Sequence, residues 1–116
     1  MSWASGGVIS TSEDMLKFIK ALVNHTLISE KTFGKMQDWA KLGPSYYYGY
    51  GIMNFRFLFM PKKYEIWGNS GSIGAFMYYN PAMDIYMIGS FQKMNYNVPP
   101  IFFILNSLKK INKRIK

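Results

Sequence analysis

Four runs of aromatic and β-branched residues between Tyr46 and Phe91 constrain the fold of this chain more than any other feature. In order, the runs are YYYGYGIMNFRFLFM, YEIW, AFMYY and IYMIGSF. Such residues favour strands, and the separators, which include Pro61 and the segment 80–84, are typical of turns. Strands joined by short turns pair with their chain neighbours, so we predict an antiparallel meander of about four strands.

Two stretches with helical periodicity precede these strands. Ser10 and Glu13 have the spacing of a capping box, which predicts a helix over about 12–24. Ser29 suits the N-cap of a second helix, which we expect to end at Gly43 and Pro44, because proline cannot continue a helix. The apolar residues on the two predicted faces are Met15, Phe18, Ile19, Leu22, Val23, Phe33, Met36 and Ala40.

A third helix is expected after the strands. Pro99 and Pro100 suit a helix start, and an apolar stripe continues to the basic end of the chain. The stripe consists of Ile101, Ile104, Leu105, Leu108 and Ile111. Residues 1–116 are therefore predicted to form one α+β unit, an antiparallel meander flanked by two N-terminal helices and one C-terminal helix.

Composition excludes several kinds of site. The chain has no cysteine, so it has no disulfide framework, no thiol nucleophile and no thiolate metal site. The single histidine, His25, follows a predicted helix end, where it is expected to cap carbonyls or face water. We therefore predict neither a metal nor another cofactor.

The net charge of +8 is concentrated at the C-terminal end, where five basic residues lie within the last eight. A basic amphipathic helix can lie on an anionic membrane surface, but a helix packed on the sheet with a solvated basic tail is the preferred interpretation. Nucleic acid is not a predicted partner, because the basic residues and the aromatic residues occupy separate segments. The sequence shows no signal peptide and no transmembrane segment, so it leaves the compartment open.

The segment WGNSGSIGAF, residues 67–76, lies between two predicted strands. It can be a turn in which glycine supplies positive φ, or a strand end that takes part in chemistry. Its Gly-x-x-Gly-x-x-Gly spacing fits neither the dinucleotide-binding fingerprint nor the P-loop, so a phosphate site is not predicted.

Three blocks of this chain occur in the order typical of one enzyme family. They are ASGGVISTSEDMLKFIKAL, the YGYGI strand, and GNSGSIGAF ahead of a strand, a turn, a strand and a final helix. The chain resembles the C-terminal part of the serine β-lactamase-like and penicillin-binding-protein-like hydrolases, in particular the class C β-lactamase and D-alanyl-D-alanine carboxypeptidase or esterase branch. The resemblance implies a partial β-lactamase/transpeptidase-like domain that lacks its N-terminal strands and its helical region.

The resemblance also implies site residues. The Lys/His-Ser/Thr-Gly strand of the family falls on Asn69, Ser70 and Gly71, and the Ser72 backbone amide becomes an oxyanion-hole donor. Asn69 departs from the family pattern, because an amide neither takes up a proton at neutral pH nor carries a positive charge. Any activity is therefore expected to be weak or altered.

The Ser-x-x-Lys nucleophile and the Tyr-x-Asn relay of the family belong upstream of the GGVIST block. Within the chain, Ser90 and Ser107 match Ser-x-x-Lys and Tyr78 opens a Tyr-x-Asn match, but these follow the block instead of preceding it. We therefore expect no nucleophile in this chain and no activity when it is alone. With the missing half supplied, the implied substrate is a β-lactam, a D-alanyl peptide or an ester, and the implied compartment is the cell envelope.

A non-enzymatic alternative stays open. A partial domain exposes a sheet edge and an apolar face, which favours self-association or binding to another protein. In that interpretation the exposed sheet or the basic C-terminal helix forms an interaction module on a protein or an anionic membrane surface.

Overall fold

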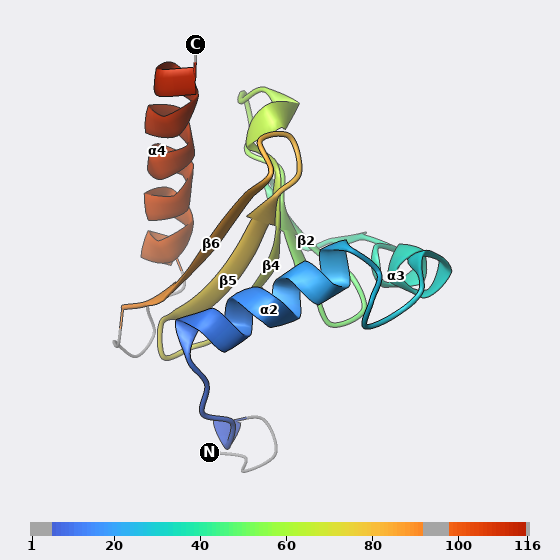
Figure 1. The fold of residues 1–116 in the computed structure, drawn as a ribbon. Coiled ribbons are helices and arrows are strands. Elements are labelled where there is room, and N and C mark those ends of the chain that lie inside the picture. The colour runs from blue at the N-terminus through green and yellow to red at the C-terminus, as the bar shows by residue number, and fades with distance from the viewer. Residues whose placement is uncertain (1–5, 92–97, 116) are drawn as a thin grey trace.

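A computed structural model describes residues 6–91 and 98–115 of this chain. Within these residues the fold is α+β, with three α-helices and a six-stranded antiparallel sheet (Figure 1). The helices are α2 (Ser12–Val23), α3 (Glu30–Met36) and α4 (Val98–Ile115), and a short 3-10 helix, η1, spans Lys62–Tyr64. The strands are β1 (Ala40–Lys41), β2 (Tyr46–Tyr48), β3 (Met53–Phe55), β4 (Ile66–Ser70), β5 (Ala75–Asn80) and β6 (Ile85–Ser90).

Every strand pairs antiparallel with its chain neighbour, in the order β1-β2-β3-β4-β5-β6. The meander was predicted, but the number of strands was wrong: the sheet has six strands where about four were expected. The run after Tyr46 divides into β2 and β3 because Gly51 adopts a φ of 79° and the Gly49 N–H donates to the Ile52 carbonyl, which closes a turn inside the run.

The second predicted helix is too long by several residues. Helix α3 begins after its N-cap Ser29, as predicted, but it ends at Met36, and Ala40 belongs to β1. The Met36 carbonyl accepts a hydrogen bond of 2.9 Å from the Tyr50 N–H in the turn between β2 and β3. This tertiary bond ties the end of α3 to the sheet, and the chain then turns into the first strand.

The other two helices lie where they were predicted, with one change in a cap. Thr11, not Ser10, is the N-cap of α2, because its hydroxyl accepts from the Asp14 N–H at 3.2 Å. The proline pair opens α4, as expected, since Val98–Ile115 includes it in the first turn.

The sheet carries a hydrophobic core on each face. Helix α4 covers one face, and α2 and α3 cover the other (Figure 1). Trp67 of β4 pairs with Tyr79 of β5, and successive strand residues point to opposite faces. Tyr78 therefore lies on the α4 side, whereas Trp67 lies on the α2 side. The buried residues on the α4 side are Tyr64, Ile66, Phe76, Tyr78, Ile101, Ile104, Leu105 and Leu108.

The two edges of the sheet differ in length. Strand β1 has two residues, whereas β6 has six and pairs with β5 alone among the described strands.

Within the described residues, no helix is long and apolar enough to cross a membrane.

Candidate functional site

The WGNSGSIGAF segment folds as a strand, a turn and a second strand. Asn69 and Ser70 end β4, residues 71–74 form the turn, and Ala75 opens β5. The Gly71 N–H donates to the Ala75 carbonyl at 2.8 Å, and Gly74 adopts a φ of 90°, which glycine tolerates best. The segment therefore contains the predicted turn with a glycine at positive φ, placed between two strand ends.

Asn69 and Ser70 present their side chains to opposite faces of the sheet. Asn69 donates from Nδ2 to the Gly51 carbonyl at 3.2 Å, which ties β4 to the turn between β2 and β3. The Ser70 hydroxyl lies on the α4 side, 3.0 Å from the Tyr78 hydroxyl and 3.7 Å from the Met53 sulfur. The structure thus joins Ser70 to Tyr78, a contact that the sequence did not predict, and directs Asn69 away from both.

A cavity of about 510 Å³ adjoins Ser70 between the sheet and the first turns of α4. Its walls are largely apolar, and its lining residues are Ser45, Tyr46, Met53, Phe55, Phe57, Ser70, Ser72, Ile101 and Phe102. Ser72 is exposed in the turn, and its N–H donates no hydrogen bond to any described residue. Ser70 and Ser72 therefore line the same apolar cavity.

Tyr78 controls what the Ser70 hydroxyl can do. The Tyr78 side chain is fully buried, and burial raises the pKa of its phenol far above the ordinary value, although the Ser70 hydrogen bond acts in the opposite direction. A phenol that stays protonated can donate or accept a hydrogen bond, but it cannot serve as a base at neutral pH. Among the described residues, the partners of the Ser70 hydroxyl are this phenol and the Met53 thioether, and neither takes up a proton at neutral pH.

The structure describes only one of the two Ser-x-x-Lys matches in full. Ser90 ends β6, and Lys93 lies outside the described residues. Ser107 lies within α4, and Lys110 of the same helix is exposed. In the part of the chain that the structure describes, no hydrogen bond joins these two side chains.

The Tyr-x-Asn match has a structural role. Asn80 is buried and donates from Nδ2 to the Lys63 and Glu65 carbonyls at 2.8 and 2.9 Å. Its Oδ1 accepts from the Met83 N–H at 2.8 Å. These bonds connect the end of β5 to its turn and to η1. Both polar atoms of the Asn80 side chain are therefore used in structural hydrogen bonds.

His25 and the acidic residues form no metal site. His25 adopts a φ of 57° just after α2, and its ring packs 5.6 Å from the Phe33 ring. Among the residues that the structure describes, no group of three His, Cys, Asp or Glu side chains could hold a metal ion.

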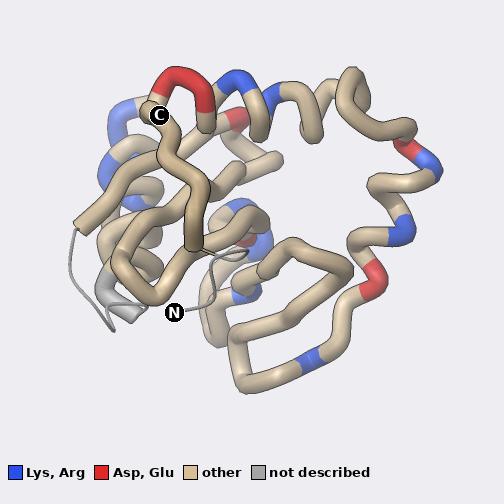
Figure 2. Tube along the Cα trace, turned by 90° about the horizontal axis from the view of Figure 1, so that it is seen from below, with Lys and Arg blue, Asp and Glu red and all other residues tan. Residues whose placement is uncertain are grey.

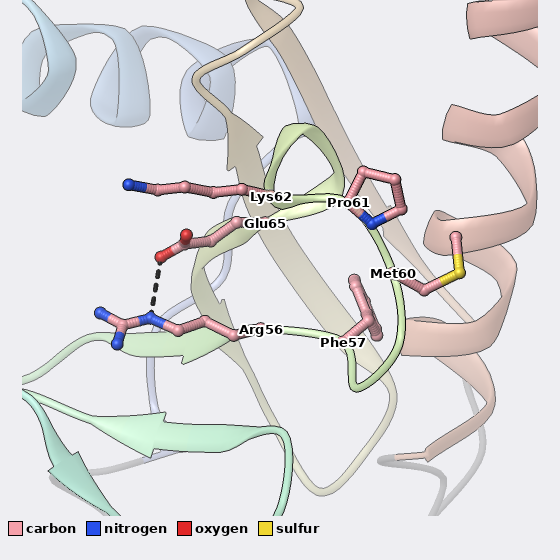
Figure 3. Close-up of a pocket in the computed structure, with 6 residues that line it drawn as sticks. All are labelled: Arg56, Phe57, Met60, Pro61, Lys62 and Glu65. Atoms are coloured by element: carbon pink, nitrogen blue, oxygen red, sulfur yellow. Dashed lines mark hydrogen bonds and ion pairs between the residues drawn. The ribbon is translucent and has the colours of Figure 1, made fainter.

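A second cavity, of about 410 Å³, lies next to a polar cluster that the sequence did not predict (Figure 3). Glu65 Oε1 accepts from Arg56 Nε at 3.1 Å and from Asn54 Nδ2 at 2.8 Å. The Arg56 guanidinium also stacks on the Tyr47 ring, 4.5 Å from its centre. The register of β3 against β4 creates this cluster, because it pairs Phe55 with Ile66. Arg56 follows Phe55 and Glu65 precedes Ile66, so the same register brings Arg56 beside Glu65. No local motif in the sequence signals it.

Neither the protein-family models nor the curated proteins compared with this chain include a match. The motif blocks and the geometry around Ser70 are therefore the features of this chain that bear on its function.

Alkaline pH should destabilise this fold through the half-buried phenol of Tyr79. Burial, followed by the hydrogen bond and charge of Asp84, raises the pKa of Tyr79 to about 12. Tyrosine in an unfolded chain titrates near pH 10, so the unfolded state loses its proton first and is favoured as the pH rises. The Tyr79 contribution to stability is thus complete below about pH 10 and is lost between about pH 10 and 12.

Urea unfolding at a series of pH values measures this effect. We expect the midpoint to fall through that range and the Tyr79→Phe variant to show a shallower fall. A variant that falls as steeply as the unmodified chain would contradict the assignment to Tyr79.

Proposed function

We propose that this chain forms one wall of the acyl-transfer site of a β-lactamase-like serine hydrolase. In this proposal the nucleophile comes from a segment outside the described residues, and the chain is the C-terminal portion of the β-lactamase/transpeptidase-like domain. The order of the three motif blocks supports the family, and the antiparallel sheet with helices on both faces is compatible with it.

The observation that carries the proposal is the convergence of Ser70 and Ser72 on one cavity. An acyl-transfer site needs donors aimed at the oxygen on which negative charge develops, and the Ser72 N–H is a backbone donor with no partner among the described residues. The Ser70 hydroxyl, held by Tyr78, can bond a substrate carboxylate.

Gly71 supports the same interpretation. A Cβ atom added at Gly71 would meet nothing within 4 Å, and Gly71 is not among the glycines with positive φ. Neither packing nor backbone geometry requires glycine there. A missing side chain at an open position allows a ligand to lie against the backbone, which is the role that the family resemblance implies.

Catalysis by this chain alone is not part of the proposal. The partners of the Ser70 hydroxyl are a neutral phenol and a thioether, and Asn69 is a neutral amide turned to the other face. The substrate classes are a β-lactam, a D-alanyl peptide and an ester, and the reaction needs no cofactor.

The long edge strand β6 is where further strands of the complete domain, or a second copy of this chain, would pair.

Intact mass spectrometry tests the proposal. The purified chain is incubated with a reporter penicillin and, separately, with a fluorophosphonate. We expect no adduct on the chain alone. We expect an adduct on the nucleophilic serine of a separately purified upstream segment that carries Ser-x-x-Lys, and only when the two pieces are mixed.

Two controls make the result specific. Ser70→Ala in the mixture should slow labelling by about tenfold or more, because a hydrogen bond to a charged group is lost. Ser107→Ala should leave the rate unchanged. A stoichiometric adduct on the chain alone would show that the nucleophile lies within it. Equal labelling of the upstream segment without this chain would show that the chain forms no wall of the site.

A further inference from the structure

The loop between β3 and η1 exposes two large apolar side chains at its tip. Leu58 is 52% exposed and Phe59 is 102% exposed. Their neighbours behave differently, because Phe57 and Met60 pack against the core on the α4 side, where Figure 3 shows Met60 directed toward α4. The loop is therefore anchored at both ends and presents only Leu58 and Phe59, here called the apolar tip, to the outside.

The backbone of the apolar tip is held in an unfavourable conformation. Phe59 adopts a φ of 61°, a region that bulky residues rarely occupy. The Met60 N–H donates to the Phe57 carbonyl at 3.1 Å, and the Leu58 N–H donates to the Ser45 hydroxyl at 3.1 Å. Glycine or asparagine would adopt this φ with less backbone strain. The exposed Phe59 ring gains no burial that would offset the strain.

Basic residues lie on the elements beside the apolar tip. Lys62 and Lys63 follow it in η1, and the Tyr64 hydroxyl accepts from Asn112 Nδ2 at 3.2 Å, which places η1 against the last turns of α4. Figure 1 shows η1 and the C-terminal end of α4 at the same end of the molecule. The basic residues of these two elements are Lys62, Lys63, Lys110, Lys113 and Arg114, here grouped as the basic cluster. Within it, Lys62 extends away from α4, on the side of Glu65 (Figure 3).

Acidic charge does little to offset this cluster. Glu65 is already paired with Arg56, so Asp84, in the turn between β5 and β6, is left to face the five basic residues. Over the whole chain, 14 Lys and Arg residues stand against 6 Asp and Glu residues; Figure 2 marks the two kinds in blue and red. An apolar protrusion beside positive charge is complementary to a bilayer surface, whose interface accepts apolar side chains and whose headgroups carry negative charge.

We propose that the apolar tip and the basic cluster dock this chain on the surface of an anionic phospholipid bilayer. The tip enters the interfacial layer, and the cluster contacts the headgroups. This docking surface is separate from the proposed acyl-transfer wall, and it includes a loop to which the sequence assigned no role.

Vesicle cosedimentation of the full chain tests the proposal. Phosphatidylcholine vesicles are compared with vesicles that also contain phosphatidylglycerol, at low and at high salt. We expect binding to the phosphatidylglycerol vesicles and a loss of binding as salt rises, because screening weakens exposed charges. Absence of binding at low salt, or equal binding to both vesicle types, would overturn the proposal. The first of these outcomes would leave the surface to a protein partner.

Matched variants separate the tip from general hydrophobicity. The double variant Leu58→Ser with Phe59→Ser should weaken binding about tenfold or more, because two apolar side chains no longer leave water. The control is Val8→Ser with Ile9→Ser, a pair that is 89% and 97% exposed elsewhere, and it should leave binding unchanged. Phe59→Gly guards against misfolding, because it relieves the positive φ: it should raise the urea midpoint and still weaken binding.

Charge variants separate the basic cluster from net charge. Lys62→Glu with Lys63→Glu should weaken binding about tenfold or more, since each basic residue near the surface contributes to attraction. Lys31→Glu with Lys35→Glu changes the net charge equally on the exposed surface of α3 and should have a much smaller effect. Equal losses from the two pairs would show attraction by net charge alone and would overturn the docking surface.

Discussion

Replacement of Gly68 by alanine is expected to destabilise this fold by about 3 kcal/mol or more, which is a large fraction of the total stability of a small domain. Gly68 lies in β4 opposite Tyr78 of β5. A Cβ atom there would lie 2.0 Å from the Met77 carbonyl oxygen and 2.8 Å from the Tyr78 Cα. Both obstacles are backbone atoms of the paired strand, so the clash cannot be relieved by a side-chain rotation and must separate β4 from β5.

Urea unfolding of Gly68→Ala beside Gly34→Ala measures this effect. A Cβ at Gly34 in α3 would meet nothing within 4 Å, and alanine favours helix, so that variant should gain about 0.5–1 kcal/mol. If Gly68→Ala unfolded at the midpoint of the unmodified chain, the close approach of β4 and β5 at this position would be wrong. A strong loss would show that this glycine serves strand packing, whatever the role of Gly71.

Ile104→Ala should cost about 2–5 kcal/mol, because it removes a fully buried side chain from between α4 and the sheet. Ile104 belongs to the cluster that includes Phe76 and Tyr78, so the cavity left by the missing atoms would lie at the centre of the α4 face. Helix α4 depends on this face, since most helical stability in proteins comes from the packing of an apolar face and not from intrinsic propensity.

The neighbouring residue provides the control for Ile104→Ala. Phe103 is 51% exposed and touches the Phe91 ring at a centroid distance of 5.7 Å. Phe103→Ala should therefore cost about 1 kcal/mol or less. Thermal unfolding of both variants compares them directly. Similar losses would indicate that α4 presents a different face to the sheet from the one described.

The helices were predictable because their signals are local. The apolar stripe of α4 and the periodicity of α2 lie entirely within each helix, and the structure buries Ile19, Ile104 and Leu108 completely. The end of α3 was not predictable, because the hydrogen bond from Tyr50 to Met36 joins residues whose approach depends on the completed turn between β2 and β3. The strand count failed for a similar reason, since the two-residue β1 leaves almost no pattern.

The candidate site was predictable only as a stretch of chain. The motif placed Asn69, Ser70, Gly71 and Ser72 together in sequence, but strand alternation sends the Asn69 and Ser70 side chains to different faces. The contact between Ser70 and Tyr78 depends on the register of β4 against β5. The exposed Phe59 was beyond prediction, because within a run of aromatic residues nothing distinguishes a loop tip from a strand.

The order of the strands has a consequence for how this sheet forms. Because each strand lies beside the one that precedes it, every ladder can close as a hairpin over a short stretch of chain, without threading one segment past another. Such a sheet has low contact order and should assemble quickly from any of its hairpins. For the same reason, a further strand can pair with β6 without breaking any existing strand pair. The sheet can therefore gain a strand after its hydrophobic cores have formed.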